Sequence, residues 1–287
     1  MTLPVQGNEE GNKMVKALVV TGFGINCEEE MAAAYRLAGA DATILHLNEL
    51  FRERDSIRRY DILNLPGGFS FGDDIGSAKV LANKFKFKKM RSGKLFIDEI
   101  AQFLNDGKYI LGVCNGFQAL VKMGLLPNIG GNFEQEVTLT GNDSGKFEDR
   151  WVHCLVTPGN PTPFLSDPAV KGLDMPVRHG EGKLIVRDAR IREAILEKKL
   201  NVLTYADRQG RPTADYPANP NGSELNCAGL CDPGGQVFGL MPHPEAYLSL
   251  YNHPAWAKKK RETPGISEEG EGLAVFRNIV SEISKKR

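Results

Sequence analysis

The sequence lacks three features that would define its class at once: a long apolar run, an excess of charge of one sign, and a glycine-rich phosphate loop. In its 287 residues no stretch approaches the ~18 consecutive apolar residues of a membrane span, so we expect no contact with a membrane. The 36 Lys and Arg residues balance 36 Asp and Glu residues, and zero net charge argues against a general nucleic-acid binder. Neither G-x-x-x-x-G-K-[S/T] nor G-x-G-x-x-G occurs, so we expect no ATP site of those types.

Cysteine is also scarce. The five residues, an odd number, include no C-x-x-C pair, and no His, Cys or Asp cluster has the spacing of metal ligands. Residues 1–13 are polar and contain no apolar segment of a secretory signal, so we expect free thiols in the cytoplasm and no metal. We predict a loose tail over residues 1–15 and one domain over residues 16–287, because 41% hydrophobic residues suffice for a substantial core.

The first part of the chain alternates apolar runs with a helical pattern. Strands are predicted at Lys16–Thr21, at Ala42–Leu47 and after Asp61, and a helix at Glu28–Leu37, which Gly39 follows. Because these runs are continuously apolar, they predict strands that are buried on both faces. We therefore predict an α/β fold with an open, mainly parallel sheet and helices on both faces. Its ligand crevice would lie beyond the carboxyl ends of the strands.

One strand end has the pattern of a nucleophile elbow. The apolar run Tyr109–Val113 precedes Cys114, and a helical pattern follows from Gly116. With Gly112 two residues before the cysteine, the spacing is that of G-x-nucleophile-x-G. The turn would place the sulfur at a helix N-terminus, where thiolate is favoured. The alternative is a buried core cysteine, since free cysteine is among the most buried residue types.

Two further apolar runs also end at residues suited to chemistry. Gly67 and Gly68 follow one of them, and paired glycines can direct two backbone N–H groups into a crevice, as an oxyanion hole requires. The other apolar run ends at His243, and Glu245 follows two residues later. A histidine followed by an acid is the order of a catalytic base and the residue that orients it. Taken singly, each could be an ordinary turn or a structural histidine. Cys27 also opens a helix, but it lacks the flanking glycines, and a packed thiol near the site is the favoured interpretation.

Four stretches occur in one order along the chain: Pro66-Gly-Gly-Phe-Ser70 with Gly72-Asp73, Gly112-Val-Cys-Asn-Gly-Phe-Gln118, His179-Gly-Glu-Gly182, and Met241-Pro-His-Pro-Glu245. Together they resemble the class I (triad) glutamine amidotransferases, whose sheet is flavodoxin-like. Within these they are most similar to the glutaminase subunits of phosphoribosylformylglycinamidine synthase, from purine biosynthesis. The resemblance runs from about residue 16 to the end of the sequence.

The resemblance implies a role for each motif residue. Cys114 would attack the side-chain amide of glutamine, His243 would act as base and then acid, and Glu245 would orient His243. Backbone N–H groups of Gly68 and Asn115 would form the oxyanion hole. The residues expected to bind glutamine are Gly67, Gln118, His179, Gly180 and Glu181. Members of the family often carry Arg where this sequence has Gly76 and Ala246, so contacts at the mouth of the site are expected to differ.

The resemblance also implies a partner. Ammonia from glutamine would pass to a synthetase subunit that makes formylglycinamidine ribonucleotide, with a small accessory subunit as a further candidate. ATP and Mg²⁺ would belong to that partner, and this chain would hold no cofactor. Two alternatives remain, an amidotransferase that serves another synthetase and a non-catalytic scaffold subunit with a vestigial triad.

Two surface segments have no assigned function. The stretch Lys84–Lys94 has six basic residues in eleven and is either a solvated face or a docking face for an acidic partner, with nucleic-acid stacking as a third, weaker alternative. Phe85 and Phe87 alternate with its lysines and could serve as apolar anchors for that partner. Asn252–Gly272 is predicted to be an exposed loop before a final helix that begins at Leu273.

Overall fold

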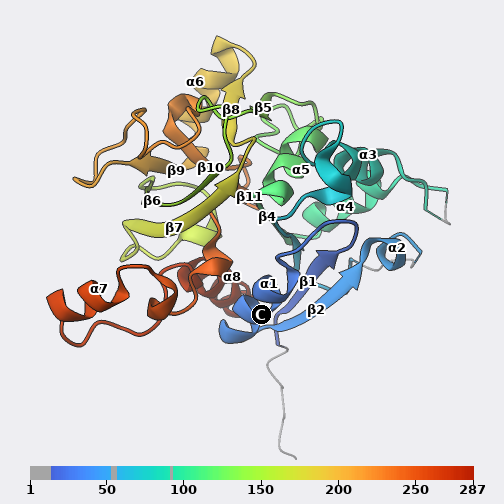
Figure 1. The fold of residues 1–287 in the computed structure, drawn as a ribbon. Coiled ribbons are helices and arrows are strands. Elements are labelled where there is room, and N and C mark those ends of the chain that lie inside the picture. Colours follow the sequence, from blue (N-terminus) through green and yellow to red (C-terminus); the bar gives the residue numbers. More distant parts are fainter. Residues whose placement is uncertain (1–13, 53–56, 91–92) are drawn as a thin grey trace, which may run out of the picture.

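An open sheet of nine strands runs through the computed structural model, which describes residues 14–52, 57–90 and 93–287 (Figure 1). The strand order is β2-β1-β3-β4-β11-β10-β9-β6-β7, and β5 and β8 form a separate two-stranded sheet. The strands are β1 (Lys16–Thr21), β2 (Asp41–His46), β3 (Ile62–Leu65), β4 (Tyr109–Val113), β5 (Val137–Thr140), β6 (Glu148–Val156), β7 (Gly172–His179), β8 (Lys183–Val186), β9 (Asn201–Ala206), β10 (Cys227–Cys231) and β11 (Val237–Leu240).

The sheet has a parallel half and an antiparallel half. Strands β2, β1, β3, β4 and β11 pair in parallel, and β11, β10, β9, β6 and β7 pair antiparallel. The predicted α/β fold, an open sheet with helices packed on it, is confirmed, and β1 and β4 have the predicted bounds. In the register of β11 on β4, Val113 lies opposite Leu240. The carboxyl ends of these two strands therefore meet at one edge of the sheet.

Two groups of helices pack on the sheet. Helices α1 (Glu28–Leu37) and α8 (Leu273–Lys285) contact each other, whereas α3 (Lys79–Phe87) contacts α4 (Phe96–Asn105) and α5 (Asn115–Met123). Right-handed crossovers from β1 to β2 and from β3 to β4 run in opposite directions along the sheet, so the two groups cover opposite faces. The remaining helices are α2 (Leu47–Leu50), α6 (Ala189–Glu197) and α7 (Trp256–Glu262).

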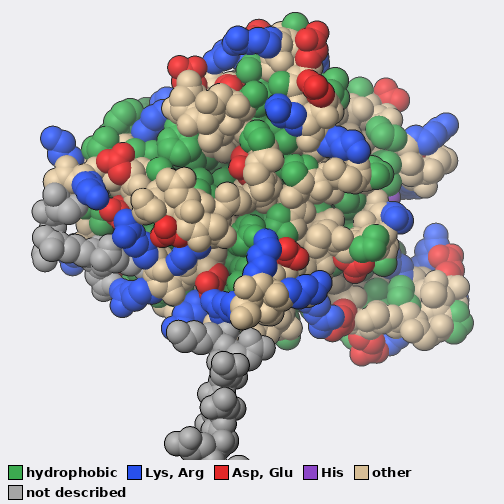
Figure 2. All heavy atoms as spheres, turned by 180° about the vertical axis from the view of Figure 1, so that it is seen from behind, with side chains coloured by type: hydrophobic (Ala, Val, Ile, Leu, Met, Phe, Trp, Pro, Cys, Tyr) green, Lys and Arg blue, Asp and Glu red, His purple; other side chains and the backbone are tan. Residues whose placement is uncertain are grey.

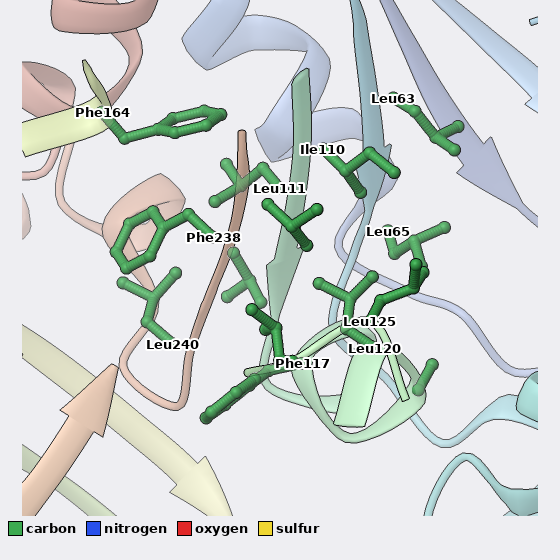
Figure 3. Packing of buried hydrophobic residues seen from close by; sticks show 14 of the residues in the cluster. Leu63, Leu65, Ile110, Leu111, Phe117, Leu120, Leu125, Phe164, Phe238 and Leu240 are labelled. Atoms are coloured by element: carbon green, nitrogen blue, oxygen red, sulfur yellow. The ribbon is translucent and has the colours of Figure 1, made fainter. Parts of the chain in front are cut away.

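The core lies between the central strands and these helices. Figure 3 shows Leu65 of β3 close to Leu120 of α5, with Leu63 of β3 and Ile110 of β4 farther along the strands. Phe238 of β11 contacts Phe164, with ring centroids 5.6 Å apart. Because this packing fixes β4 and β11 from both faces, the strand ends that form the candidate site rest on a rigid base.

The basic stretch Lys84–Lys94 differs from its prediction. Its first residues belong to α3, and Phe85 is fully buried, with ring centroids 5.1 Å from Phe96 and 5.8 Å from Phe51. Phe85 therefore anchors the chain's own core, and its predicted role as an anchor for a partner is wrong. Phe87 is 63% exposed. The docking interpretation of the lysines stays a prediction, and residues 91–92 lie outside the described residues.

The segment Asn252–Gly272 is not wholly a loop, as was predicted, because it contains α7. Lys259 of this helix forms ion pairs with Asp174 (2.7 Å) and Glu271 (2.9 Å). The first of these pairs holds α7 against β7, the strand at the edge of the sheet. The predicted tail lies, except for its last two residues, outside the described residues.

The surface shows a balance of charge. Basic and acidic side chains are interspersed on the face opposite to that of Figure 1 (Figure 2). In the described part of the chain, no helix combines the length and apolar character that crossing a membrane requires.

Candidate active site

Cys114 sits on a sharp turn between β4 and α5. Its backbone has φ 51° and ψ −107°, in a region that a residue with a side chain adopts at a cost of about 1–3 kcal/mol. The flanking glycines leave room for close packing, because a Cβ on Gly116 would lie 1.9 Å from the carbonyl oxygen of Leu65, and a Cβ on Gly112 would lie 2.5 Å from Leu120 Cδ1. The turn expected of a nucleophile elbow is therefore present, and it places the thiol of Cys114 at the N-terminus of α5.

His243 and Glu245 follow β11, the strand next to β4. His243 Nδ1 donates a hydrogen bond to Glu245 Oε1 over 2.5 Å, and the two residues are only 2% and 4% exposed. Burial lowers the pKa of His243, but the negative charge of Glu245 and the neighbouring thiols of Cys114 and Cys27 outweigh it and raise that pKa well above its usual value. The imidazolium form of His243 is therefore stabilised beside Cys114.

The turn at Gly67 and Gly68 abuts both of these groups. A Cβ built on Gly67 would lie 2.8 Å from His243 Cε1 and 3.5 Å from Cys114 Cβ. Gly68 has a φ of +141°, which suits glycine alone among common residues. Within the described part of the chain, no hydrogen bond is formed by the backbone N–H of Gly68 or of Asn115. Three predicted strand ends thus converge, as the sequence led us to expect.

Cys27 lies in the same cluster. A loop contact brings it there, because the N–H of Asn26 donates to the carbonyl of Gly67 (3.2 Å). A Cβ on Gly67 would lie 3.3 Å from Cys27 Sγ. Burial raises the pKa of Cys27, the neighbouring imidazole of His243 lowers it, and the charge of Glu245 raises it further. The packed-thiol interpretation of Cys27 placed it near the site, and the structure puts it directly beside His243.

A polar network joins two of the predicted glutamine-binding residues. Gln118 Nε2 donates to the backbone oxygen of Glu181 (2.6 Å), and Asn115 Nδ2 donates to Gln118 Oε1 (3.0 Å). Asn115 Nδ2 also contacts both carboxylate oxygens of Asp73 at 3.2 Å. The loop that contains Glu181 is thereby held against the first turn of α5. Asp73 belongs to one of the sequence motifs, but the motif alone predicted no role for it.

His179 and Gly180 are held by a residue that sequence reasoning missed. Asn142 Oδ1 lies 3.1 Å from His179 Nδ1, and the N–H of Asn142 donates to the carbonyl of Gly180 (2.9 Å). Burial, followed by the positive charge of His243, lowers the pKa of His179 to about 4. His179 is therefore neutral at pH 7. No motif surrounds Asn142, so only the fold reveals its position.

The end of β7 also reaches the cysteine. Cys114 Sγ donates to the backbone oxygen of Arg178 at 3.4 Å. The site therefore combines elements from both halves of the sheet: β4 and β11 from the parallel part, and β7 with its following loop from the antiparallel part. A thiol, a buried imidazole paired with a carboxylate, and unbonded N–H groups nearby are the components of nucleophilic acyl transfer.

Comparison with known proteins agrees with this arrangement. The sequence profile of the CobB/CobQ-like glutamine amidotransferase domain matches residues 14–281. The phosphoribosylformylglycinamidine synthase subunit PurQ of Dehalococcoides mccartyi is 39% identical over 268 residues, which cover 93% of this chain and 96% of that protein. The PurQ subunit of Methanococcus maripaludis is 38% identical over 284 residues, which cover 94% and 98%.

A solved structure is also similar. The structure of PurLQS from Thermotoga maritima superposes with a TM-score of 0.66 at 29% identity, covering 94% of this chain and all of the matched chain. Fold and site together define a class I glutamine amidotransferase. More closely, the chain belongs to the family of the PurQ subunits of phosphoribosylformylglycinamidine synthase.

Proposed function

We propose that this chain is the glutaminase subunit of a phosphoribosylformylglycinamidine synthase and hydrolyses glutamine to glutamate and ammonia. The observation that supports this most directly is the meeting of Cys114 and the buried His243–Glu245 pair beside the Gly67–Gly68 turn. Similarity over nearly the whole length of PurQ subunits supports the same assignment.

The proposed reaction begins with the thiol of Cys114. Its proton passes to His243 Nε2, and the sulfur attacks the side-chain carbonyl carbon of glutamine. His243 then gives that proton to the amide nitrogen, so that ammonia leaves and a thioester remains. Glu245 stabilises the imidazolium formed in between, which agrees with the raised pKa of His243. Water, deprotonated by the same imidazole, releases glutamate and restores the thiol.

The N–H groups of Gly68 and Asn115 are proposed to bind the oxyanion of the tetrahedral intermediate. Removing one such donor typically lowers the rate by about 10²–10³-fold. Gln118 and the His179–Gly180–Glu181 segment, together with Gly67, are proposed to line the pocket for glutamine. Their position around the first turn of α5, held by Asn115 and Asn142, supports this.

Ammonia is proposed to pass to a synthetase subunit, by analogy with the PurLQS assembly of Thermotoga maritima. A small accessory subunit is a further candidate partner. ATP and Mg²⁺ are assigned to that synthetase, and this chain is assigned no cofactor of its own. The cytoplasm is the proposed compartment, and five cysteines without a disulfide agree with it.

The test is Cys114→Ala in the complex reconstituted with the synthetase subunit. Glutamine-dependent synthesis should fall to background, while synthesis from added ammonium salt should persist, because free ammonia bypasses only the chemistry of this chain. Loss of both activities would show that the substitution disrupts assembly. If Cys27→Ala abolished the glutaminase and Cys114→Ala did not, the assignment of the nucleophile would be wrong.

A further inference from the structure

Three metal-binding groups lie together at the site although they are far apart in the sequence. Cys27 Sγ, a ring nitrogen of His243 and a carboxylate oxygen of Glu245 all lie within 4.8 Å of one another. His243 and Glu245 are buried, while Cys27 is partly exposed and provides access from solvent. Spacing along the chain predicted no metal ligands, because the residues come from the loop after β1 and from the end of β11.

Two atoms of this cluster are buried without a partner. His243 Nε2 and Glu245 Oε2 form no hydrogen bond within the described part of the chain. A carboxylate only accepts, so the bond between His243 Nδ1 and Glu245 requires the proton on Nδ1 and leaves a lone pair on Nε2 when the ring is neutral. A histidine that binds a metal through one nitrogen and donates to a carboxylate through the other is the usual arrangement of zinc ligands.

The distances also suit zinc. Zinc–sulfur bonds of ~2.3 Å and zinc–nitrogen bonds of ~2.0–2.1 Å place the two donor atoms of a tetrahedral site about 3.6 Å apart. The span of 4.8 Å in the cluster is an upper limit, so Cys27 Sγ and the ring nitrogen are at most about 1.2 Å farther apart than such a site requires. Cys114 borders the same space, since it and Cys27 both face the position of a Cβ on Gly67.

We propose that this cluster is an inhibitory zinc site, in which Cys27 Sγ and His243 Nε2 bind Zn²⁺ and Glu245 orients the imidazole. The thiol of Cys27 loses its proton to solvent as the sulfur–zinc bond forms. Water completes the tetrahedron. The metal occupies the lone pair that would accept the proton of Cys114, so glutamine hydrolysis stops. Mg²⁺ prefers oxygen ligands and does not bind here.

Metal binding is independent of the proposed function, whereas the inhibition rests on it, and the two are measured separately. The full chain, kept reduced with a reagent that does not bind zinc, is titrated with Zn²⁺ against a coloured chelator. Cys27→Ser should bind Zn²⁺ at least tenfold more weakly than the natural chain. Cys231→Ser is the matched control, because Cys231 precedes the hairpin at the opposite end of β11, and its affinity should be unchanged. Equal affinity in Cys27→Ser and the natural chain would overturn the site.

Inhibition is then measured on the complex with the synthetase, relative to the metal-free glutaminase rate of each variant. Zn²⁺ should inhibit the natural chain, excess chelator should restore the rate, and Cys27→Ser should need at least tenfold more Zn²⁺. Zinc binding without inhibition would overturn the inhibitory role, although the zinc-binding site itself would stand. If Cys27→Ser does not fold, alkylation of the natural chain decides, because Zn²⁺ should protect Cys27 from iodoacetamide and Mg²⁺ should not. An unprotected Cys27 at saturating Zn²⁺ would refute the proposal.

Discussion

The substitution Gly67→Ala should disable the glutaminase and leave the fold intact. The backbone of Gly67 does not have a positive φ, so alanine causes no strain in the chain itself. Its Cβ would, however, lie 2.8 Å from His243 Cε1, whereas ordinary contact begins near 3.4 Å. The ring must therefore retreat by about 0.6 Å, and the hydrogen bond to the buried Glu245 restricts the directions in which it can move.

The expected loss follows from how strongly rates depend on position. A displacement approaching 1 Å of a catalytic group costs about 10²-fold in rate, which corresponds to about 2.7 kcal/mol of activation free energy. We therefore expect glutamine-dependent synthesis by the reconstituted complex to fall about 10²-fold. Synthesis from ammonia should stay at the level of the natural complex, because the partner performs that reaction. The thermal midpoint of the variant should change by a few degrees at most.

Gly141→Ala is the matched control. Gly141 also has no positive φ, and a Cβ there meets no heavy atom within 4 Å. This variant should retain both activities. If Gly67→Ala hydrolysed glutamine at the natural rate, either the ring of His243 would tolerate displacement or His243 would not be the base, and the proposed geometry of catalysis would be refuted.

Two predictions concern stability. Phe85→Ala should lower the free energy of unfolding by about 3–5 kcal/mol, because the side chain of Phe85 is fully buried. Phe87→Ala should change it by less than about 0.5 kcal/mol, because Phe87 is exposed. Urea titrations compare the two variants, and equal effects would contradict the packing of Phe85 in the core. The hydrogen bond that His153 donates to Asp174, opposed by burial, raises the pKa of His153. The resulting stabilisation is complete below about pH 6.5 and is lost as the pH rises through the folded-state pKa. The destabilisation caused by His153→Gln should therefore shrink in urea titrations as the pH rises above about 6.5, and a difference independent of pH would exclude the ion pair as its cause.

Much of the parallel half of the fold could be predicted from the sequence. The bounds of β1, α1 and β4 agree with prediction because each is a continuous apolar run or a clear amphipathic pattern. Helix α3 could not be predicted in the same way. Its buried Leu81 and Phe85 lie four residues apart on one face, but the lysines between and around them gave the stretch the pattern of a solvated surface.

The candidate site was predictable only where a motif marks it. Cys114, His243 and Glu245 could be found because each follows an apolar strand. Asn142 comes to the site through contacts with His179 and Gly180, and the contact between Asn26 and Gly67 puts Cys27, which was expected only near the site, directly beside His243. The partners in these contacts are distant in sequence. No local pattern encodes such a contact, since it depends on how two strands are placed side by side in the folded sheet.

The position of β11 has a consequence for synthesis of the chain on the ribosome. This strand lies in the middle of the sheet, between β4 and β10, although it is the last strand to be made. Until it emerges, one edge of β4 has no neighbour, and at roughly 5–20 residues per second that interval lasts on the order of ten seconds. On the proposed mechanism, the nascent chain then holds Cys114 without His243, and it cannot hydrolyse glutamine until β11 and His243 have been made. The same interval exposes an apolar strand edge to other chains, so the step that delays activity is also the step at which aggregation is most favoured.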